Sequence, residues 1–525
     1  MAHIEVPVGD TLNAEQEGYK QSLGRRQVQM IAIGGAIGTG LFLGSASRLH
    51  STGPALVLSY GFVGVVAFLL MRALGELVLH RPTSGAFVSY TREFYGEKWA
   101  YVTGWMFWLN WALTGIAELS AVGLYVQFWF PTVPAWETVL IALAVVLTVN
   151  LLSAAAFGEF EFWAALLKVT MIVVFLGVGL VVVIGQFHVG AHRAGFQNLW
   201  DNPGGFWPSS AGFHWYGPIL VMSGVVFAYA AIEMVAVASG EMQDARREVP
   251  KAVNAVIFRI AVFYCGSILL LSAMEPTSRY VAGESPFVTV FGAMGLSWIG
   301  TAVQAVLIIA AMSSLNSGLF ATGRILRSLA MSKQAPTFTM KMSRTGVPWA
   351  GIVLTSVVYV FGALLNAVDP AAFENTLEAA ALGVLATWAA LFACQLRLRQ
   401  LSDRGVIPPS PFQMPGYPYT SIIGLGFLAL VVVGMGISGW QSSPYFWHKT
   451  DFLVVAIGIP VIATVLTIGW VLAKPKVAAS LNGRLKPVWS ADGPTYTRVA
   501  QPGAPGGQTA PIDPPTTSEA DRHAP

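Results

Sequence analysis

Four ionisable side chains lie inside long apolar runs of this chain, where an ionised group is expensive. They are Glu118 in WALTGIAELSAVGLY, Lys168 in GEFEFWAALLKV, Glu233 in FAYAAIEMVAVASGE and Glu76 in RALGELVLH. In a hydrocarbon environment such a group usually faces a partner or a cavity, where it can bind a charged ligand or carry a proton. These residue types therefore indicate the handling of ligands or protons inside an apolar environment.

Each of the four residues also has a structural interpretation. Glu118 lies near the middle of its run, too far from either end for its short side chain to reach water except through a cavity, which favours a functional role. Lys168 can snorkel its ammonium to the membrane surface, and Glu233 can be a protonated carboxyl bonded to a neighbouring helix. Glu76 follows Arg72 by four residues, a helical spacing that predicts a structural or gating ion pair rather than a substrate contact.

The stretch IAIGGAIGTGLFLG, residues 31–44, is apolar but crowded with glycines. A glycine inside a helix costs about 1 kcal/mol relative to alanine. The pair Gly34 and Gly38 can instead let two membrane helices pack closely. The further glycines and Thr39 favour a helix that breaks here, because free N–H groups and the positive end of a half-helix suit the carboxylate of a small substrate.

Other polar and aromatic residues in the apolar runs have simpler interpretations. The run SSLNSGL, residues 313–319, predicts hydrogen bonds between helices. Tryptophans such as Trp111 are interpreted as an interface belt and as bundle packing. No catalytic constellation, metal-ligand spacing or cofactor motif is evident, so we expect no enzyme activity, no cofactor and no bound metal.

The elements that must position these residues follow from composition and hydropathy. Of the 525 residues, 54% are hydrophobic and 11% charged, far below the roughly 25% charged content of soluble domains. The chain is therefore a polytopic membrane protein. The formal net charge of +3 says little about partners, and we expect no nucleic acid among them. About twelve membrane-spanning helices are predicted, starting near residues 28, 54, 99, 136, 161, 214, 253, 298, 348, 373, 420 and 452.

The distribution of basic residues predicts the orientation of these helices. Alternate loops are rich in lysine and arginine, and the positive-inside rule places these loops and both termini in the cytoplasm. We expect an N-terminal tail over residues 1–26, one membrane domain over 27–474, and a largely disordered, Pro/Gly-rich tail over 475–525. The basic residues are Arg81, Arg92 and Lys98; Arg246, Arg247 and Lys251; Arg324, Arg327, Lys333, Lys341 and Arg344; and Arg397, Arg399 and Arg404.

Several motifs occur in an order that resembles the amino acid permeases of the amino acid, polyamine and organocation superfamily. They are the glycine stretch, RALGELVLHRPTSGAFVSY, GEFEFWAALLKV, FAYAAIEMVAVASGE with PKAVNAV, and SPFVTVF. The match covers nearly the whole chain up to about Lys474. The resemblance implies an all-α integral membrane fold of two five-helix repeats with inverted topology. Helices one and six are broken around the substrate, and two extra helices follow at the C-terminus.

The resemblance also implies a substrate site built from the two broken helices. The substrate carboxylate is expected against Thr39 and Gly40, its amino group near backbone carbonyls, and the ring of Phe227 as a lid. Alanines stand in AYAAIE where many relatives have a glycine, which leaves the break in the sixth helix less certain. The implied residues are Ile37, Thr39, Gly40, Phe227 and Ala230, with Gly38 in a supporting position.

For proton coupling, the resemblance points to the fifth span. In proton-coupled transporters of this fold a lysine there can occupy the position where sodium-coupled relatives bind a cation, and Lys168 matches it. We expect its ammonium to meet carbonyls of the first span and the hydroxyls of Ser313 and Ser314. Glu233 is a second candidate for proton coupling. Glu118 is expected to face the substrate cavity and either to contact the substrate or to exchange a proton.

The sequence thus predicts a proton-coupled amino acid importer of the inner (plasma) membrane, surrounded by lipid and either monomeric or homodimeric. Three runs, among them EGYKQSLGRRQVQMIAIGGAIGTGLFLG, are most similar to bacterial L-asparagine permeases, which makes asparagine the leading substrate. Those permeases often have an aspartate where this chain has Glu118. Glycine/D-alanine, aromatic amino acids and 4-aminobutyrate therefore remain open, as do the classes of ion channel and nutrient sensor.

Overall fold

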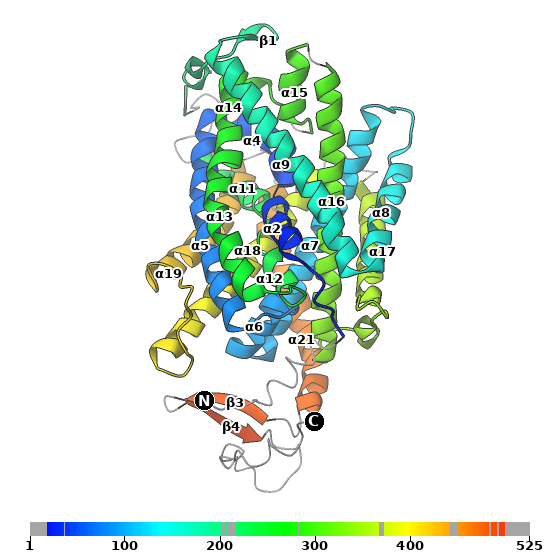
Figure 1. Ribbon diagram of the computed structural model, residues 1–525, viewed down its shortest axis with the longest axis vertical. Helices are drawn as coiled ribbons and strands as arrows, with labels where there is room; N and C mark the ends of the chain where they lie inside the picture. The colour runs from blue at the N-terminus through cyan, green and yellow to red at the C-terminus, as the bar shows by residue number, and fades with distance from the viewer. Residues whose placement is uncertain are drawn as a thin grey trace.

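The computed structural model shows a bundle of helices, most of which run roughly along the long axis of the molecule (Figure 1). It describes residues 18–35, 37–201, 205–207, 217–281, 283–295, 297–366, 372–441, 450–481, 485–490 and 493–498. In this part of the chain, eight helices are long and apolar enough to cross a membrane, and two shorter apolar helices accompany them. The protein is a multi-pass, all-helical membrane protein.

The first half of the chain contains α2 (Arg25–Gly34), α3 (Thr39–Phe42), α4 (Ser45–Thr52), η1 (Gly53–Ala55), α5 (Leu56–His80), α6 (Ala86–Tyr95), α7 (Glu97–Gln127), α8 (Ala135–Leu152), α9 (Ala154–Ile184), β1 (His188–Val189), β2 (His192–Arg193), η2 (Phe196–Leu199), α10 (Gly217–Leu220), α11 (Met222–Ala228), α12 (Met234–Ser239) and α13 (Ala245–Arg259). The second half contains η3 (Ile260–Cys265), α14 (Gly266–Met274), η4 (Thr277–Arg279), α15 (Pro286–Ala293), α16 (Ser297–Met331), η5 (Thr337–Met340), α17 (Trp349–Asn366), α18 (Ala372–Asp403), α19 (Tyr419–Gln441), α20 (Thr450–Leu453), η7 (Val454–Gly458), α21 (Ile459–Leu481), β3 (Leu485–Ser490) and β4 (Gly493–Arg498). The strands form two antiparallel pairs, β1 with β2 and β3 with β4.

Helical structure is interrupted at both places where the sequence analysis expects a break. In the first predicted span, α2 ends at Gly34 and the helix resumes at Thr39. In the sixth, α11 ends at Ala228 and α12 begins at Met234. The alanines of the second break do not prevent it, although Ala231 takes a φ of +73°, a conformation that side chains other than glycine rarely adopt.

The long helices coincide with most of the predicted spans. The eight span-length helices match the second to fifth, eighth, and tenth to twelfth predicted segments, and the shorter apolar helices Val262–Met274 and Trp349–Leu364 match the seventh and ninth. The sixth segment is not among them because it is divided into short helices. The first segment is divided after Gly34, and its second part is joined to the second segment in the run Thr39–His80. The count of twelve spans and the inverted repeats therefore remain predictions.

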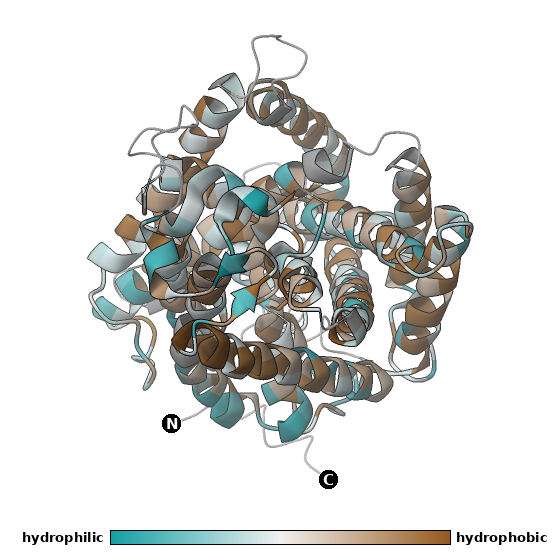
Figure 2. Ribbon diagram, turned by 90° about the horizontal axis from the view of Figure 1, so that it is seen from above, coloured by the Kyte–Doolittle hydropathy of each residue, from teal (hydrophilic) through white to brown (hydrophobic). Residues whose placement is uncertain are grey.

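Helix α7 lies inside the bundle and packs against α16, α17, α18 and α6. Helix α9 packs against α2 and α16, so it joins the first broken helix to the rest of the bundle. Apolar residues line the helices at the rim (Figure 2), and no residue in the most apolar window of the outer helix α21 is buried. These rim surfaces are suited to contact with lipid.

The chain just before α2 closes one end of the bundle. The N–H of Leu23 donates to the carbonyl of Glu241 at 3.0 Å, and the N–H of Gln243 donates to the carbonyl of Leu23 at 3.3 Å. Below this contact, Arg324 on α16 forms an ion pair with Glu241 in which both side chains are 1% exposed. We call this the basic end, because Arg81, Arg92, Arg246 and Arg399 also lie on the helix ends and turns gathered there.

Ordered structure continues beyond the predicted end of the membrane domain at residue 474. Helix α21 runs on to Leu481, since the segment KVAASL contains good helix formers. The hairpin of β3 and β4 follows within the segment assigned to the tail. Residues 1–17 of the predicted N-terminal tail and 499–525 of the C-terminal tail lie outside the described residues.

Candidate functional site

A small internal cavity lies where the two helix breaks face each other. Its walls come from the chain between α2 and α3, from α3, α7, α11 and α16, and from the turn after α11. The cavity contains most residues of the implied substrate site, drawn from segments far apart in the sequence. The lining residues are Gly35, Gly38, Thr39, Gly40, Asn110, Trp111, Thr114, Glu118, Phe227, Ala228, Ala230, Ala231 and Ser314.

Glu118 supplies the acidic group of the cavity. Its side chain projects from α7 and the residue is 2% exposed. The hydroxyl of Thr39 donates to Glu118 Oε1 at 2.8 Å, which joins α7 to α3. The other oxygen, Oε2, is buried and has no hydrogen-bond partner among the described residues. Glu118 therefore offers one free acceptor beside the helix break.

Hydrogen-bond donors are present in the part of the cavity wall that comes from the start of α3. The backbone N–H groups of Thr39 and Gly40 begin this helix and have no acceptor among the described residues. A Cβ atom added to Gly40 would lie 2.7 Å from Ala228 Cα, so glycine is required for α3 to approach α11 this closely. The two broken helices thus place donors and an acceptor around one cavity.

Not every residue implied for substrate binding lies on the cavity wall. Phe227 and Ala230 line it, but the carbonyl of Phe227 already accepts from the N–H of Ala230 at 2.9 Å within the turn. Ile37 is 1% exposed and is not among the lining residues. Gly38, in its supporting position, does line the cavity.

Trp111 lies inside the bundle, in agreement with the packing role expected from the sequence, and not in an interface belt. It is 2% exposed, lines the cavity, and its indole Nε1 has no hydrogen-bond partner among the described residues. Asn110 and Thr114 flank it on α7, and the Thr114 hydroxyl donates to Asn110 Oδ1 at 3.3 Å. Sequence reasoning missed these two residues, although a helical spacing of four from Asn110 to Thr114 and from Thr114 to Glu118 marks one face of α7.

Lys168 forms the centre of a second polar cluster beside the cavity. Its ammonium Nζ donates to the carbonyl of Gly34 at 2.6 Å and to the hydroxyl of Ser313 at 3.0 Å. The residue is 1% exposed, so snorkelling to the membrane surface is excluded in this conformation. The expected contacts with the first span and with Ser313 are present, whereas Ser314 lines the cavity instead. Lys168 therefore joins α9, α2 and α16.

Glu161 extends this cluster and was not identified as a functional candidate from the sequence. The hydroxyl of Ser313 donates to Glu161 Oε2 at 2.7 Å, and Asn316 Nδ2 donates to Oε1 at 2.7 Å. Asn150 Nδ2 donates in turn to Asn316 Oδ1 at 2.6 Å. Glu161 precedes Lys168 by seven residues, about two helical turns, which places both on one face of α9. Their link depends on a third residue from α16, which spacing alone does not reveal.

Glu233 lies outside both the cavity lining and the Lys168 cluster. It is fully buried at the start of α12, and its Oε2 accepts from Trp388 Nε1 on α18 at 3.5 Å. Its Oε1 has no hydrogen-bond partner among the described residues. The contact with α18 matches the structural interpretation of a carboxyl bonded to a neighbouring helix, while a role in proton coupling remains a prediction.

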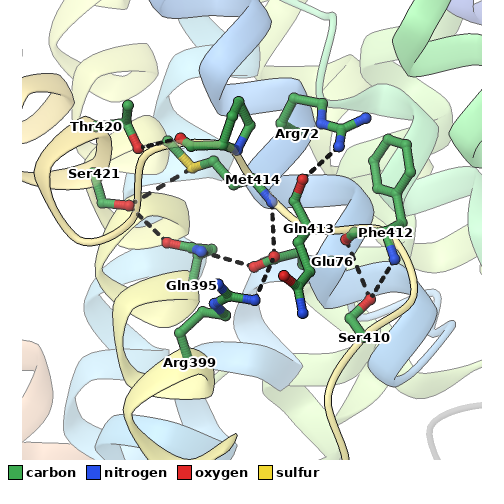
Figure 3. A network of polar contacts seen from close by, with 11 residues as sticks. Arg72, Glu76, Gln395, Arg399, Ser410, Phe412, Gln413, Met414, Thr420 and Ser421 are labelled. Carbon is green, nitrogen blue, oxygen red and sulfur yellow. Dashed lines mark hydrogen bonds and ion pairs between the residues drawn. The ribbon is translucent and has the colours of Figure 1, made fainter. Parts of the chain in front are cut away.

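Glu76 has different partners from those its sequence spacing predicts. Its oxygens accept from Gln395 Nε2 at 2.7 Å and from the N–H of Met414 at 2.8 Å, and Arg399 Nη1 lies 3.7 Å away (Figure 3). Arg72 instead donates to Asn254 Oδ1 and to the carbonyl of Gln413. The predicted pair of Arg72 and Glu76 is therefore wrong, because α18 and the loop after it supply stronger partners for Glu76.

The interhelical role predicted for residues 313–319 is confirmed by the bonds of Ser313 and Asn316 to α9 and α8. The cavity itself has a volume of ≈ 20 Å³, enough for about one water molecule. An amino acid requires the cavity walls to move apart. Trp111 and Phe227 are the bulkiest side chains on its wall.

Comparisons with known proteins give a consistent result. Residues 27–482 match the family model described as "Amino acid permease". The chain is 50% identical over 471 residues to the L-asparagine permease of Escherichia coli K12, covering 89% of this chain and 91% of that protein. It is 48% identical over 474 residues to L-asparagine permease 1 of Mycobacterium tuberculosis H37Rv, covering 90% of this chain and 94% of that protein. It is 47% identical over 481 residues to the L-asparagine permease of Streptomyces coelicolor, covering 91% of this chain and 95% of that protein.

Proposed function

Because the chain belongs to the amino acid permease family, we propose that it imports L-asparagine together with protons across the cytoplasmic membrane. The family makes it an amino acid transporter and not an enzyme. Asparagine is supported by the named function of relatives that share about half of its residues over nearly their whole length. Both termini are placed in the cytoplasm, and the transporter acts as a monomer or homodimer in the lipid bilayer.

The observation that carries the substrate assignment is the placement of opposite hydrogen-bonding groups around one cavity. The N–H groups of Thr39 and Gly40 suit the substrate carboxylate, since they combine free donors with the positive end of a helix. The free Oε2 of Glu118 suits the α-amino group or the side-chain amide of asparagine. An α-amino acid satisfies both sides of the cavity at once.

Coupling to protons is assigned to Lys168. In its charged form the ammonium donates to Gly34 on α2 and to Ser313 on α16, and the nearby carboxylate of Glu161 balances the charge. Loss of the proton would remove the charge that makes these bonds strong and would loosen α2 from α9 and α16. The first broken helix would then move more easily, which links the proton to the alternation between outward- and inward-facing states.

Transport by purified protein in proteoliposomes tests this function. Labelled asparagine should accumulate when an inward proton gradient is imposed, and unlabelled asparagine should compete better than glycine, D-alanine, phenylalanine or 4-aminobutyrate. Lys168→Ala should abolish accumulation but retain exchange of asparagine across the membrane. The control Lys341→Ala changes an exposed lysine and should behave as wild type.

Three results would contradict parts of the proposal. Accumulation that is unaffected by the proton gradient would remove proton coupling. Full accumulation by Lys168→Ala would remove the assigned role of this residue. Stronger competition by any of the other amino acids would replace asparagine as the substrate.

A further inference from the structure

A second cavity lies at the basic end, away from the substrate site. It is enclosed by the last turn of α5, the first turn of α13, the C-terminal part of α18 and the proline-rich loop that follows α18. Its volume is ≈ 210 Å³. Three basic residues line it, namely His80, Arg246 and Arg399, and no acidic residue is among the described residues of its lining.

Arg399 has a largely buried side chain in this cavity, and its guanidinium lies 5.0 Å from the centroid of the Tyr417 ring. The side chain is only 15% exposed, yet it makes no hydrogen bond to any described residue, and its buried Nε has no partner. Its nearest carboxylate oxygen, Glu76 Oε1, lies 3.7 Å away and already accepts from the N–H of Met414 (Figure 3). A guanidinium carries five N–H donors, and leaving them unsatisfied in a largely buried position is costly.

The other two basic residues are not neutralised by an acid within the cavity. Arg246 is exposed and has no hydrogen-bond or ion-pair partner among the described residues. His80 Nε2 and Glu93 Oε1 are 2.9 Å apart. Burial raises the pKa of Glu93, but the hydrogen bond from His80 and the charge of Arg81 outweigh it, so this pKa lies below its usual range. Glu93 is thus an ionised carboxylate already shared between His80 and Arg81, outside the cavity lining.

The proline-rich loop forms the remaining wall of the cavity. Pro408, Pro409 and Pro411 restrict the backbone of the loop. The end of the loop is tied to α5, because Arg72 donates to the carbonyl of Gln413 and the N–H of Met414 donates to Glu76 (Figure 3). A rigid wall lowers the conformational entropy that the loop loses when a ligand binds.

We propose that this cavity binds the phosphate group of an anionic ligand, with Arg246 and Arg399 donating to its oxygens. Planar guanidinium groups match phosphate geometry and form strong charge-assisted hydrogen bonds. The cavity lies at the ends of the apolar helices α5 and α18, and basic pockets between membrane helices are suited to anionic lipids. The ligand source is therefore a phospholipid headgroup or a soluble phosphate, and the site is independent of asparagine transport.

Binding to purified, delipidated protein tests the site with two probes. Native mass spectrometry after exchange into micelles that contain phosphatidylglycerol or phosphatidylcholine measures retained lipid. Thermal unfolding in inorganic phosphate, compared with chloride at equal ionic strength, measures the soluble anion. Arg246→Ala removes one proposed donor from an exposed position, and Arg247→Ala is a matched control that removes the neighbouring charge outside the cavity lining.

Wild type and Arg247→Ala should retain phosphatidylglycerol in preference to phosphatidylcholine, and Arg246→Ala should bind it about tenfold more weakly, or 1.4 kcal/mol. Arg399→Gln should weaken it similarly, with size-exclusion chromatography as the check on folding. Stabilisation by inorganic phosphate that depends on Arg246, without retained lipid, would support the site and assign a soluble source. Equal behaviour of Arg246→Ala and Arg247→Ala with both probes would overturn the proposal.

Discussion

Lys168 and Glu161 lie two turns apart on α9 and meet through a hydroxyl of α16. Ser313 donates its hydrogen to Glu161, which leaves its oxygen lone pairs for Lys168. Asn316 also donates to Glu161, so both oxygens of this carboxylate are satisfied. Because the Ser313 hydroxyl donates its hydrogen to Glu161, its oxygen is left to accept from the ammonium of Lys168.

Glu161→Gln should disturb this orientation, because an amide can donate as well as accept and no longer balances the lysine charge. We expect gradient-driven asparagine accumulation to fall by about 10-fold to 100-fold, as hydrogen bonds to charged groups contribute about 1.5 to 3 kcal/mol. The pH dependence of uptake should shift, while exchange without a gradient persists. Uptake from pH 5 to 8 and counterflow in proteoliposomes measure both effects.

The control for this variant is Glu159→Gln on the same helix. Glu159 is 40% exposed and pairs with Arg26 at the surface, so its neutralisation should leave accumulation close to wild type. A Glu161→Gln protein with the wild-type pH profile would show that Glu161 has only a structural role.

At the scale of the elements, the contact between α2 and α9 depends on glycine. A Cβ atom added to Gly34 would lie 2.2 Å from Ala165 Cβ, a separation that real atoms do not tolerate. The same glycine supplies the carbonyl that accepts from Lys168 at 2.6 Å. Close helix packing and the proposed coupling contact therefore share one position, which explains why a glycine pair and a helix break occur together.

Gly34→Ala should force α2 and α9 apart and break the hydrogen bond to Lys168. Overpacking of this kind costs about 1 to 3 kcal/mol. We expect a lower melting temperature and at least a tenfold loss of accumulation, measured by thermal unfolding and by uptake. Adding Ala165→Gly to this variant should restore part of the stability and part of the accumulation, because it removes the nearer of the two clashing atoms of Ala165.

Gly426→Ala on α19 is the matched control, since an added Cβ there meets no atom within 4 Å. It should leave uptake unchanged and should not lower stability, because alanine favours the helix by about 1 kcal/mol over glycine. Normal transport by Gly34→Ala alone would show that the close approach of α2 and α9 is not needed for function.

At the scale of the whole molecule, one end is closed and strongly basic. Leu23 bonds to the turn after α12, and the buried pair of Arg324 and Glu241 lies beneath it. The substrate cavity is too small for an amino acid in this conformation. Transport therefore requires the basic end, which we assign to the cytoplasm, to open during the cycle.

Labelling of single cysteines tests this orientation. In a variant with Cys265 and Cys394 replaced, His188→Cys and Arg247→Cys each place a thiol at an exposed position at opposite ends of the bundle. In intact cells a membrane-impermeant maleimide should label the His188→Cys variant within minutes. It should label the Arg247→Cys variant only after the cells are permeabilised. The reverse pattern would invert the proposed topology.

Much of this protein could be predicted from the sequence, because the signals are local. Low charge and long apolar runs identify a multi-pass membrane protein, since each residue contributes separately to the free energy of transfer into lipid. Clustered glycines in residues 31–44 indicated the first break. Glu118 and Lys168 were indicated as isolated ionisable residues in apolar runs. An ionised group is costly in hydrocarbon and usually faces a partner or a cavity.

Other features were decided only by tertiary structure. The link from Lys168 to Glu161 runs through Ser313, 145 residues beyond Lys168, and Glu76 finds Gln395 rather than the nearby Arg72. Trp111 faces the cavity because α7 is surrounded by other helices, and Ala228 meets Gly40 although the second break contains alanines. Such contacts depend on the rotation and depth at which separate helices pack, and these are set by side-chain interdigitation between distant segments rather than by the order of residues within one segment.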